Sequence, residues 1–252
     1  MSTALCACTS RQPSDSTVTT SVDTLVRQTE KPTADTLTII NNSAIDQTTN
    51  CGYDNDVSAL GQGLVLASWT ITLYNDSLLS DLYLKWNIDS GNPPVKPVCT
   101  KYFKPDYNIM HFVCLSKTNK HFKVLINFDQ IKYLPNIQAY NFKTWGDYIL
   151  QSYGLSRKIE HNGDRKDNQP IYHEPNENSK LVPIPTGLEM FCPMEVKGDW
   201  VKVKWDCFYN VEDNPHSGAP CHDFIDKCKN PLTGWVKWRQ DNTVLVEIYL
   251  MP

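Results

Sequence analysis

The sequence predicts a mainly β protein, with two β-rich blocks that follow a polar N-terminal segment. Aromatic residues make up 11% of the chain and include seven Trp and twelve Tyr, side chains that favour strands over helices. Short runs of alternating apolar and polar residues recur within residues 57–156 and again within residues 169–252. Hydrophobic residues account for 40% of the 252 residues, which is enough for compact cores.

The charge balance argues against one class of partner. The chain has 24 Lys and Arg against 28 Asp and Glu, a net charge of −4, and the two signs are interspersed. A nucleic-acid-binding protein needs a clustered basic surface to meet phosphates, so we expect no nucleic-acid partner. No run of 18 or more apolar residues occurs, so no membrane-spanning helix is predicted.

Residues 1–56 are predicted to be a truncated lipoprotein-type signal remnant followed by a disordered tether. The segment Leu5-Cys6-Ala7-Cys8 resembles the bacterial lipobox, which implies lipidation of Cys8 and a membrane contact through a lipid anchor only. The match departs from that pattern because only five residues precede Cys6 and none of them is basic. Residues 9–50 are polar and lack aromatics, a composition that cannot bury enough apolar surface to fold. A plain polar tail with two incidental cysteines is the alternative.

Cysteine usage indicates the compartment. Nine cysteines are many for a cytosolic chain of this length and are more natural in an oxidising environment. Together with the lipobox-like segment, they predict a cell-envelope location, in the periplasm or at the outer membrane. A cytoplasmic location is the alternative.

The first block, residues 57–156, is expected to contain strands and one short helix. Strands are predicted at residues 65–74, 81–87, 98–103, 109–115 and 121–127, and a helix is predicted at residues 144–154, with Thr144 as its N-cap and Gly154 at its end. A hairpin centred between Asp106 and Tyr107 sets Cys99 opposite Cys114. Opposed side chains lie near disulfide reach, so this pair is a disulfide candidate, and two ordinary buried cysteines are the alternative.

The second block, residues 169–252, follows a polar linker at residues 157–169. Strands are expected at residues 171–172, 187–192, 200–205, 234–238 and 244–250, with a tight turn over residues 196–199. The order of a strand, a loop, a Gly-led strand, Gly-Asp-Trp-Val-Lys-Val and then Gly-Trp-Val is similar to the bacterial SH3-like domain family. This resemblance implies an SH3-like β-barrel that binds a ligand and is not an enzyme.

The resemblance has two limits. Residues 206–233 form an insertion longer than the loop that usually joins the two corresponding strands. Weak echoes of the same motifs in the first block are compatible with a second SH3-like copy and equally with an unrelated β-rich domain.

A candidate binding face follows from the period of two in a strand. In residues 200–205, Val201 and Val203 fall on one side, predicted to be core, and this leaves Trp200 and Lys202 on the other. By the same count, Trp235 lies with Lys237. Together with Tyr172, they are expected to line an aromatic, mildly basic groove of the kind SH3 domains use for extended peptides. Aromatic rings that merely cover the ends of a barrel are the alternative.

The insertion gathers possible metal and disulfide ligands, namely Cys207, His216, Cys221, His222 and Cys228. Their spacing is too loose for a typical tetrahedral zinc site, so no metal and no cofactor is predicted. A disulfide from Cys207 or Cys221 to Cys228 is favoured, because it would staple a long loop.

The positions of the candidate catalytic residues in the sequence argue against an enzyme. Cys221, His222 and Asp223 are adjacent in sequence, whereas catalytic groups assemble across a fold. The sequence therefore predicts a non-enzymatic binding module for a peptide, glycan or protein partner. An accessory assembly subunit without a groove ligand is the main alternative, and a cell-wall hydrolase is a less favoured one.

Overall fold

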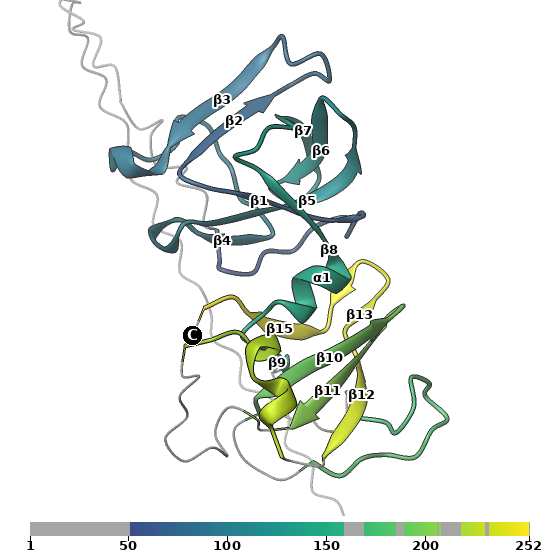
Figure 1. The fold of residues 1–252 in the computed structure, drawn as a ribbon. Coiled ribbons are helices and arrows are strands. Elements are labelled where there is room, and N and C mark those ends of the chain that lie inside the picture. The colour runs from purple at the N-terminus through teal and green to yellow at the C-terminus, as the bar shows by residue number, and fades with distance from the viewer. Residues whose placement is uncertain are drawn as a thin grey trace, which may run out of the picture. The chain divides into compact units, whose positions relative to one another are not determined.

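The computed structural model describes residues 51–158, 169–184, 189–205, 207, 218–229 and 232–251. All of them belong to one compact unit, Ser43–Pro252 (Figure 1). Residues 1–50 of the predicted tether, which include Cys8, most of the expected linker, and His216 lie outside the described residues. The prediction of disorder is wrong for residues 51–56, because Cys51 is bonded to Cys99 and Asp54 forms a bridge with Tyr102. Within the described parts, no helix has the length and apolar character needed to cross a membrane.

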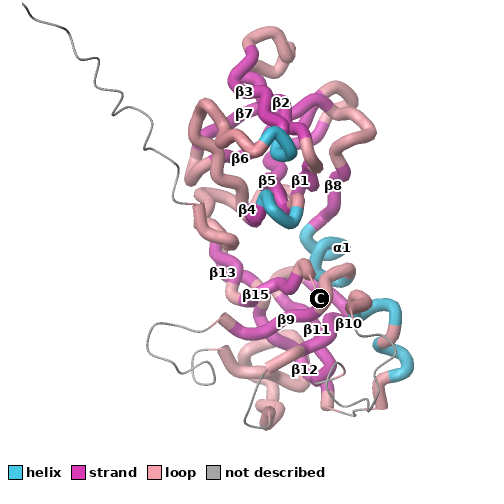
Figure 2. Tube along the Cα trace, turned by 90° about the vertical axis from the view of Figure 1, so that its left-hand side faces the viewer, coloured by secondary structure: helices cyan, strands magenta, loops and turns pink. Residues whose placement is uncertain are grey.

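The first sheet has eight antiparallel strands. Its order is β3-β2-β7-β6-β5-β1-β8, and β4 pairs with β5 beside that path. The bounds are β1 (Gly63–Ala67), β2 (Thr70–Tyr74), β3 (Leu82–Asn87), β4 (Tyr102–Lys104), β5 (Ile109–Lys117), β6 (His121–Ile126), β7 (Gln130–Pro135) and β8 (Asn141–Thr144). The short 3-10 helices Ile88–Ser90 and Pro105–Tyr107 lie between strands, as Figure 2 shows in cyan.

The second sheet has five antiparallel strands in the order β12-β11-β10-β9-β15. The bounds are β9 (Gly154–Arg157), β10 (Phe191–Lys197), β11 (Trp200–Trp205), β12 (Thr233–Lys237) and β15 (Val246–Tyr249). A separate two-stranded ribbon joins β13 (Arg239–Gln240) to β14 (Thr243–Val244), and the 3-10 helices Cys221–Asp223 and Ile225–Lys227 follow β11.

The prediction of a mainly β fold is confirmed, but the prediction of a closed barrel is not. The described strands of the second sheet form a path with two ends, β12 and β15, that are not paired to each other. Strand β9 lies between β10 and β15 in this sheet, and only its last residue, Arg157, was expected to belong to the linker. The predicted boundary at residue 156 therefore falls inside a strand.

Two further local predictions are corrected. The strand expected at residues 65–74 is broken into β1 and β2 by a corner at Trp69, whose φ is +23°. The single helix, α1 (Trp145–Leu150), has Thr144 as its N-cap, as predicted, and the Thr144 side chain accepts the Asp147 N–H. The helix ends earlier than expected, because Gln151 is its C-cap and Gly154 already belongs to β9.

One hydrophobic cluster joins the two sheets. Strands β1 and β5 bury both faces, so Leu64 and Val113 pack into this shared cluster while Val65 and Phe112 pack into a second cluster inside the first sheet. The shared cluster also receives side chains from α1 and from the second sheet, including Trp145, Tyr148, Ile149, Val201, Val236 and Trp238. Continuous apolar burial of this kind makes the two sheets one folding unit.

Three disulfides are present, and they correct part of the sequence prediction. The predicted hairpin register is right, since Tyr102 pairs with His111 and Lys104 with Ile109. The ladder stops at Tyr102, however, and Cys99 instead exchanges hydrogen bonds with Asn127. The prediction of a Cys99–Cys114 disulfide is therefore wrong.

The observed pairs are Cys51–Cys99, Cys192–Cys221 and Cys207–Cys228, and Cys114 is a buried free thiol. Two disulfide partners were predicted for Cys228, Cys207 and Cys221, and the structure shows the bond to Cys207. Three disulfides indicate an oxidising, non-cytoplasmic location.

His111 is buried where the first sheet meets α1. Its Nδ1 lies 2.8 Å from the Tyr148 hydroxyl, and the two rings meet edge to face. Burial, and secondarily the charge of Lys143, lowers the pKa of His111 from 6.5 to about 3. The unfolded chain therefore binds one more proton than the folded chain between these two pH values, so this histidine destabilises the fold as the pH falls.

We expect acid to destabilise the wild-type protein more than a His111→Gln variant. Between pH 7 and pH 5, His111 alone should remove about 2 kcal/mol from the free energy of unfolding, because the unfolded imidazole titrates in that range and the buried one does not. Urea unfolding at both pH values measures the difference, and every other titrating group is common to the two proteins. Parallel stability profiles for the two proteins would contradict the expectation.

Candidate functional site

The residues predicted to bind a ligand lie together on one face of the second sheet. Strands β11 and β12 are antiparallel, and their register pairs Trp200 with Lys237 and Lys202 with Trp235. On the other side of β11, Lys197 of β10 pairs with Trp200. We call the surface formed by Tyr172, Lys197, Trp200, Lys202, Trp235 and Lys237 the Trp200 face.

The opposite side of β11 is core, as predicted. Val201 is 0% exposed and Val203 is 1% exposed, and both lie in the cluster shared by the two sheets. Trp200 and Lys202 are half-buried on the other side. The turn before β11 places Gly198 at a φ of +59°, a conformation that glycine adopts without steric cost.

Trp200 is held by contacts from two directions. The rings of Tyr172 and Trp200 meet edge to face, with their centroids 5.5 Å apart. The Lys237 Nζ lies 5.9 Å from the centroid of the Trp200 ring and 2.6 Å from a carboxylate oxygen of Glu177. A lysine that contacts a ring and a carboxylate together keeps its ammonium oriented over the face.

Trp235 is more deeply buried than predicted, at 7% exposure. The reason is that Tyr172 pairs with Trp235 in an isolated antiparallel bridge, with N–H to O distances of 2.9 and 2.7 Å in the two directions. This pairing covers the outer edge of β12. Gly234 allows it, since a Cβ at that position would meet the Ile171 side chain and would lie 3.1 Å from the Tyr172 carbonyl oxygen.

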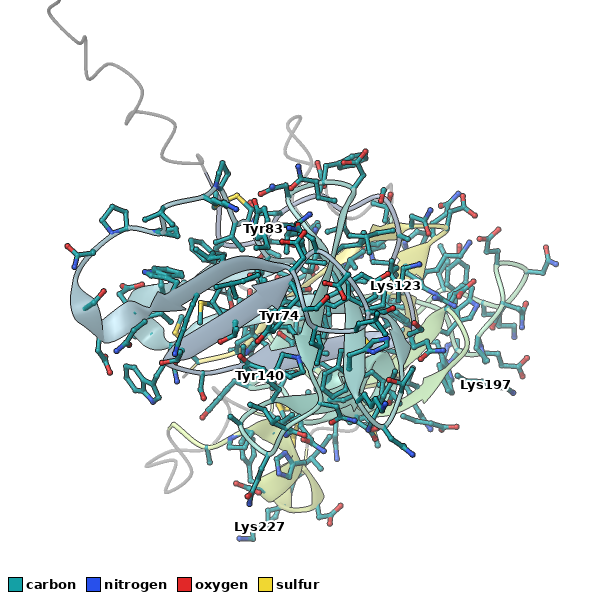
Figure 3. The ribbon with its side chains drawn as sticks, turned by 90° about the horizontal axis from the view of Figure 1, so that it is seen from above. Tyr74, Tyr83, Lys123, Tyr140, Lys197 and Lys227 are labelled. Atoms are coloured by element: carbon teal, nitrogen blue, oxygen red, sulfur yellow. A yellow bond between two sulfur atoms is a disulfide. The ribbon has the colours of Figure 1, made fainter. Side chains whose placement is uncertain are left out.

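The Trp200 face is basic although the whole chain is acidic. Lys197, which is labelled in Figure 3, and Lys202 have no ion-pair partner within the described parts of the chain. Glu195 stands opposite Lys202 in the register, and the hydrogen bond from Lys237 to Glu177 raises the pKa of Lys237. Lys237 therefore stays charged at neutral pH, and a face that gathers three lysines favours a ligand with negative charge.

An apolar cavity of about 360 Å³ is lined in part by Ile171, the residue that precedes Tyr172 in the sequence. Its lining includes Ile171, Leu181 and Arg157, and Leu181 forms a bridge with Tyr172. The Arg157 guanidinium is occupied, because it donates to both carboxylate oxygens of Glu189 and to the backbone carbonyl of Gln169. The charged group in the cavity lining, the Arg157 guanidinium, thus already has hydrogen-bond partners, and the rest of the lining suits an apolar side chain.

The cysteine, histidine and aspartate of the insertion do not form a nucleophilic site. Cys221 is bonded to Cys192, so it has no thiol, and the His222 Nε2 lies 3.2 Å from the carboxylate of its sequence neighbour, Asp223. The free thiol of Cys114 is buried, and burial raises its pKa to about 11, which keeps it protonated.

The same disulfides remove thiolate ligands from the insertion. Cys207, Cys221 and Cys228 all lie in disulfide bonds. Among the residues that the structure describes, no three His, Cys, Asp or Glu side chains come together as a metal site would need.

Sequence reasoning found five members of the face and missed two supporting residues. Lys197 could have been found, because the turn at residues 196–199 fixes its pairing with Trp200. Glu177 could not, because it belongs to a long polar loop whose return to β12 depends on the Tyr172 bridge.

The comparisons with known proteins add no constraint. The chain matches no model of a protein family, and searches of the curated proteins and of the solved structures also find no match.

We expect Gly234→Ala to destabilise the protein by about 1–3 kcal/mol, the usual range for overpacking, since the new methyl group would push against Ile171 and the Tyr172 backbone. Gly146→Ala is the matched control. In helix α1, its Cβ would meet nothing closer than 3.8 Å, and alanine has the higher helix propensity, so no loss is expected. Urea unfolding of both variants measures the difference. Equal stability of the two variants would contradict the close packing of Ile171 on β12.

Proposed function

We propose that this chain is a non-enzymatic binding protein of the cell envelope, which uses the Trp200 face to hold an extended, acidic segment of a peptide or protein. The observation that carries the proposal is the convergence of Tyr172, Trp200 and Lys237 in direct contact on one face of a rigid sheet. Aromatic rings on a sheet supply contact area with little loss of conformational entropy, and the nearby lysines supply charge complementarity.

The cavity lined by Ile171 and Leu181 supports a ligand that continues past Tyr172, because Leu181 pairs with Tyr172. An extended chain places alternate side chains on one side, so one residue could enter the cavity at Leu181 while its neighbours lie across Trp200. Leu181 is 60% exposed and borders the cavity, which gives such a side chain an apolar contact at the entrance.

We further propose that the second sheet is a diverged SH3-like module, on the strength of its motif order in residues 169–252. The strand Trp200–Trp205 and the turn at Gly198 agree with that order. A hydrolase is the weaker alternative, since Cys221 lies in a disulfide and Cys114 is a buried thiol.

Trp200→Ala should weaken binding by at least about tenfold, because the ring contributes the central contact of the face. The probe is a peptide selected against the full chain from a random library, with affinity measured by fluorescence anisotropy. Lys237→Ala should also weaken binding and reduce its dependence on salt. Phe128→Ala and Lys123→Ala, in the first block, are the matched aromatic and lysine controls, and Lys123 is labelled in Figure 3.

Binding by Trp200→Ala at wild-type strength, with an unchanged circular dichroism spectrum, would remove the Trp200 face as the site. Purification of the chain as a stable complex whose assembly survives Trp200→Ala would favour an accessory subunit instead.

The envelope location rests on the three disulfides and on the segment Leu5–Cys8, and we propose a lipid on Cys8. Expressed from its own locus, the protein should then partition with membranes and carry labelled palmitate. Cys8→Ser should release it into the soluble extract without label. A wild-type protein that carries no label would contradict the lipid anchor.

A further inference from the structure

Trp69 is the most exposed of the seven tryptophans, all of which the structure describes. Its exposed fraction is 52%, whereas Trp200 is half-buried and the other five are at most 8% exposed. It stands at the corner between β1 and β2, away from both hydrophobic clusters. Its side chain therefore contributes no core packing that would explain it.

The backbone at Trp69 adopts a conformation that bulky residues avoid. Its φ of +23° is uncommon for any residue with a Cβ and is easy only for glycine. Two hydrogen bonds hold it there: its N–H donates to the Asn108 side chain at 2.7 Å, and its carbonyl oxygen accepts the Ile88 N–H at 2.8 Å. Glycine would fit this corner better, so the choice of tryptophan points to a role outside the fold.

A second exposed aromatic residue belongs to the segment that braces Trp69. Tyr107 is 60% exposed and ends the 3-10 helix Pro105–Tyr107, directly before Asn108. Asn108 has a φ of +56°, and its N–H donates to the Pro105 carbonyl at 2.9 Å. The Asn108 side chain that fixes Trp69 is thus itself fixed next to Tyr107.

The surroundings of the two rings are polar. The Lys104 Nζ lies 4.0 Å from the centroid of the Tyr107 ring. Asn87 and Asp89 flank Ile88, whose N–H bonds to Trp69, and both are exposed. A lysine thus contacts the Tyr107 ring and the Asn108 amide bonds the Trp69 backbone, in contrast to the broad apolar patch that a membrane or an apolar protein surface would favour.

We propose that Trp69 and Tyr107 form a stacking platform for a sugar ring of a glycan, a site independent of the Trp200 face. A pyranose ring has the matching character: its C–H groups carry partial positive charge and meet the negative face of an aromatic ring. Its hydroxyl groups project from the ring edge, where the Lys104 ammonium beside Tyr107 can bond them. The site is rigid before binding, because backbone hydrogen bonds hold both turns.

Trp69→Gly separates this role from a structural one. The full chain is run in native gels that contain laminarin, xylan or galactomannan, and is sedimented with purified peptidoglycan. We expect at least one of these glycans to retain the wild-type protein, and Trp69→Gly and Tyr107→Ala to weaken that retention by about tenfold. Trp69→Phe should keep part of it, and Val95→Ala, which removes another exposed apolar side chain, should leave it unchanged.

Stability gives an independent readout. Glycine relieves the backbone at residue 69, so the urea midpoint of Trp69→Gly should equal or exceed that of the wild-type protein. A lower midpoint would assign Trp69 to the fold and overturn the proposal.

Other outcomes also overturn the proposal. These are a wild-type protein that none of the four glycans retains, and a Trp69→Gly variant retained as strongly as wild type. Sedimentation with vesicles of phosphatidylethanolamine and phosphatidylglycerol that is lost in Trp69→Gly would assign the platform to a membrane. Trp200→Ala should retain glycan binding, which keeps the test separate from that of the Trp200 face.

Discussion

The contact between Trp145 and Trp238, whose ring centroids are 5.5 Å apart, ties the first sheet to the second. Trp145 comes from α1, and its Nε1 donates to the Leu60 carbonyl at 2.7 Å. Trp238 follows β12, and its Nε1 donates to the Gly198 carbonyl at 2.9 Å. Each ring thus fills the shared cluster with its apolar body and satisfies its one polar group, which is the condition for burying tryptophan without penalty.

This contact also supports the Trp200 face. The Trp238 N–H bonds to the Asp199 carbonyl, so the turn Gly198–Asp199 is held from both of its residues just before Trp200 begins β11. Lys237 immediately precedes Trp238 in sequence. Because Trp238 is anchored in the core and bonds the turn Gly198–Asp199, the buried structure fixes the positions of both Trp200 and Lys237.

Local sequence pattern predicted what depends on neighbours in sequence. The alternation in residues 200–205, the turn at Gly198, the cap at Thr144 and the register around Asp106 follow from adjacent side chains and turn geometry, and the structure contains all of them. Pairing between distant strands is different, because no local signal sets it. Arg157 was predicted to begin the polar linker, yet it ends β9 and is buried against Glu189, 32 residues away.

The wrong disulfide prediction, Cys99–Cys114, also depended on a pairing between distant segments. Opposed positions in a predicted hairpin identified Cys99 and Cys114 as neighbours, and the register was right. What no local pattern showed was that the chain joins the ladder only at Tyr102, and that Cys99, before it, bonds Asn127 and forms its disulfide with Cys51. Strand length, set by contacts remote in sequence, decided the pairing.

The distribution of tryptophan separates what the fold requires from what it merely tolerates. Five of the seven are buried: four lie in the two hydrophobic clusters, and Trp235 is covered by its pairing with Tyr172, so packing accounts for their burial. Trp200 and Trp69 remain, and they are supported in opposite ways. Trp200 is braced by the side chains of Tyr172 and Lys237, whereas the hydrogen bonds that hold Trp69 go to its backbone.

The two arrangements have one feature in common. Neighbouring side chains hold Trp200 on an exposed face, and hydrogen bonds hold the Trp69 backbone in a conformation that a bulky side chain disfavours. Each arrangement keeps an indole accessible where water would otherwise favour its burial or replacement. The two indoles differ in their electrostatic setting, since lysines pair with Trp200 on both neighbouring strands, while the side chain that bonds the Trp69 backbone is the neutral amide of Asn108. That difference favours different ligand chemistries at the two sites, an anionic chain at the first and a neutral polyhydroxylated ring at the second.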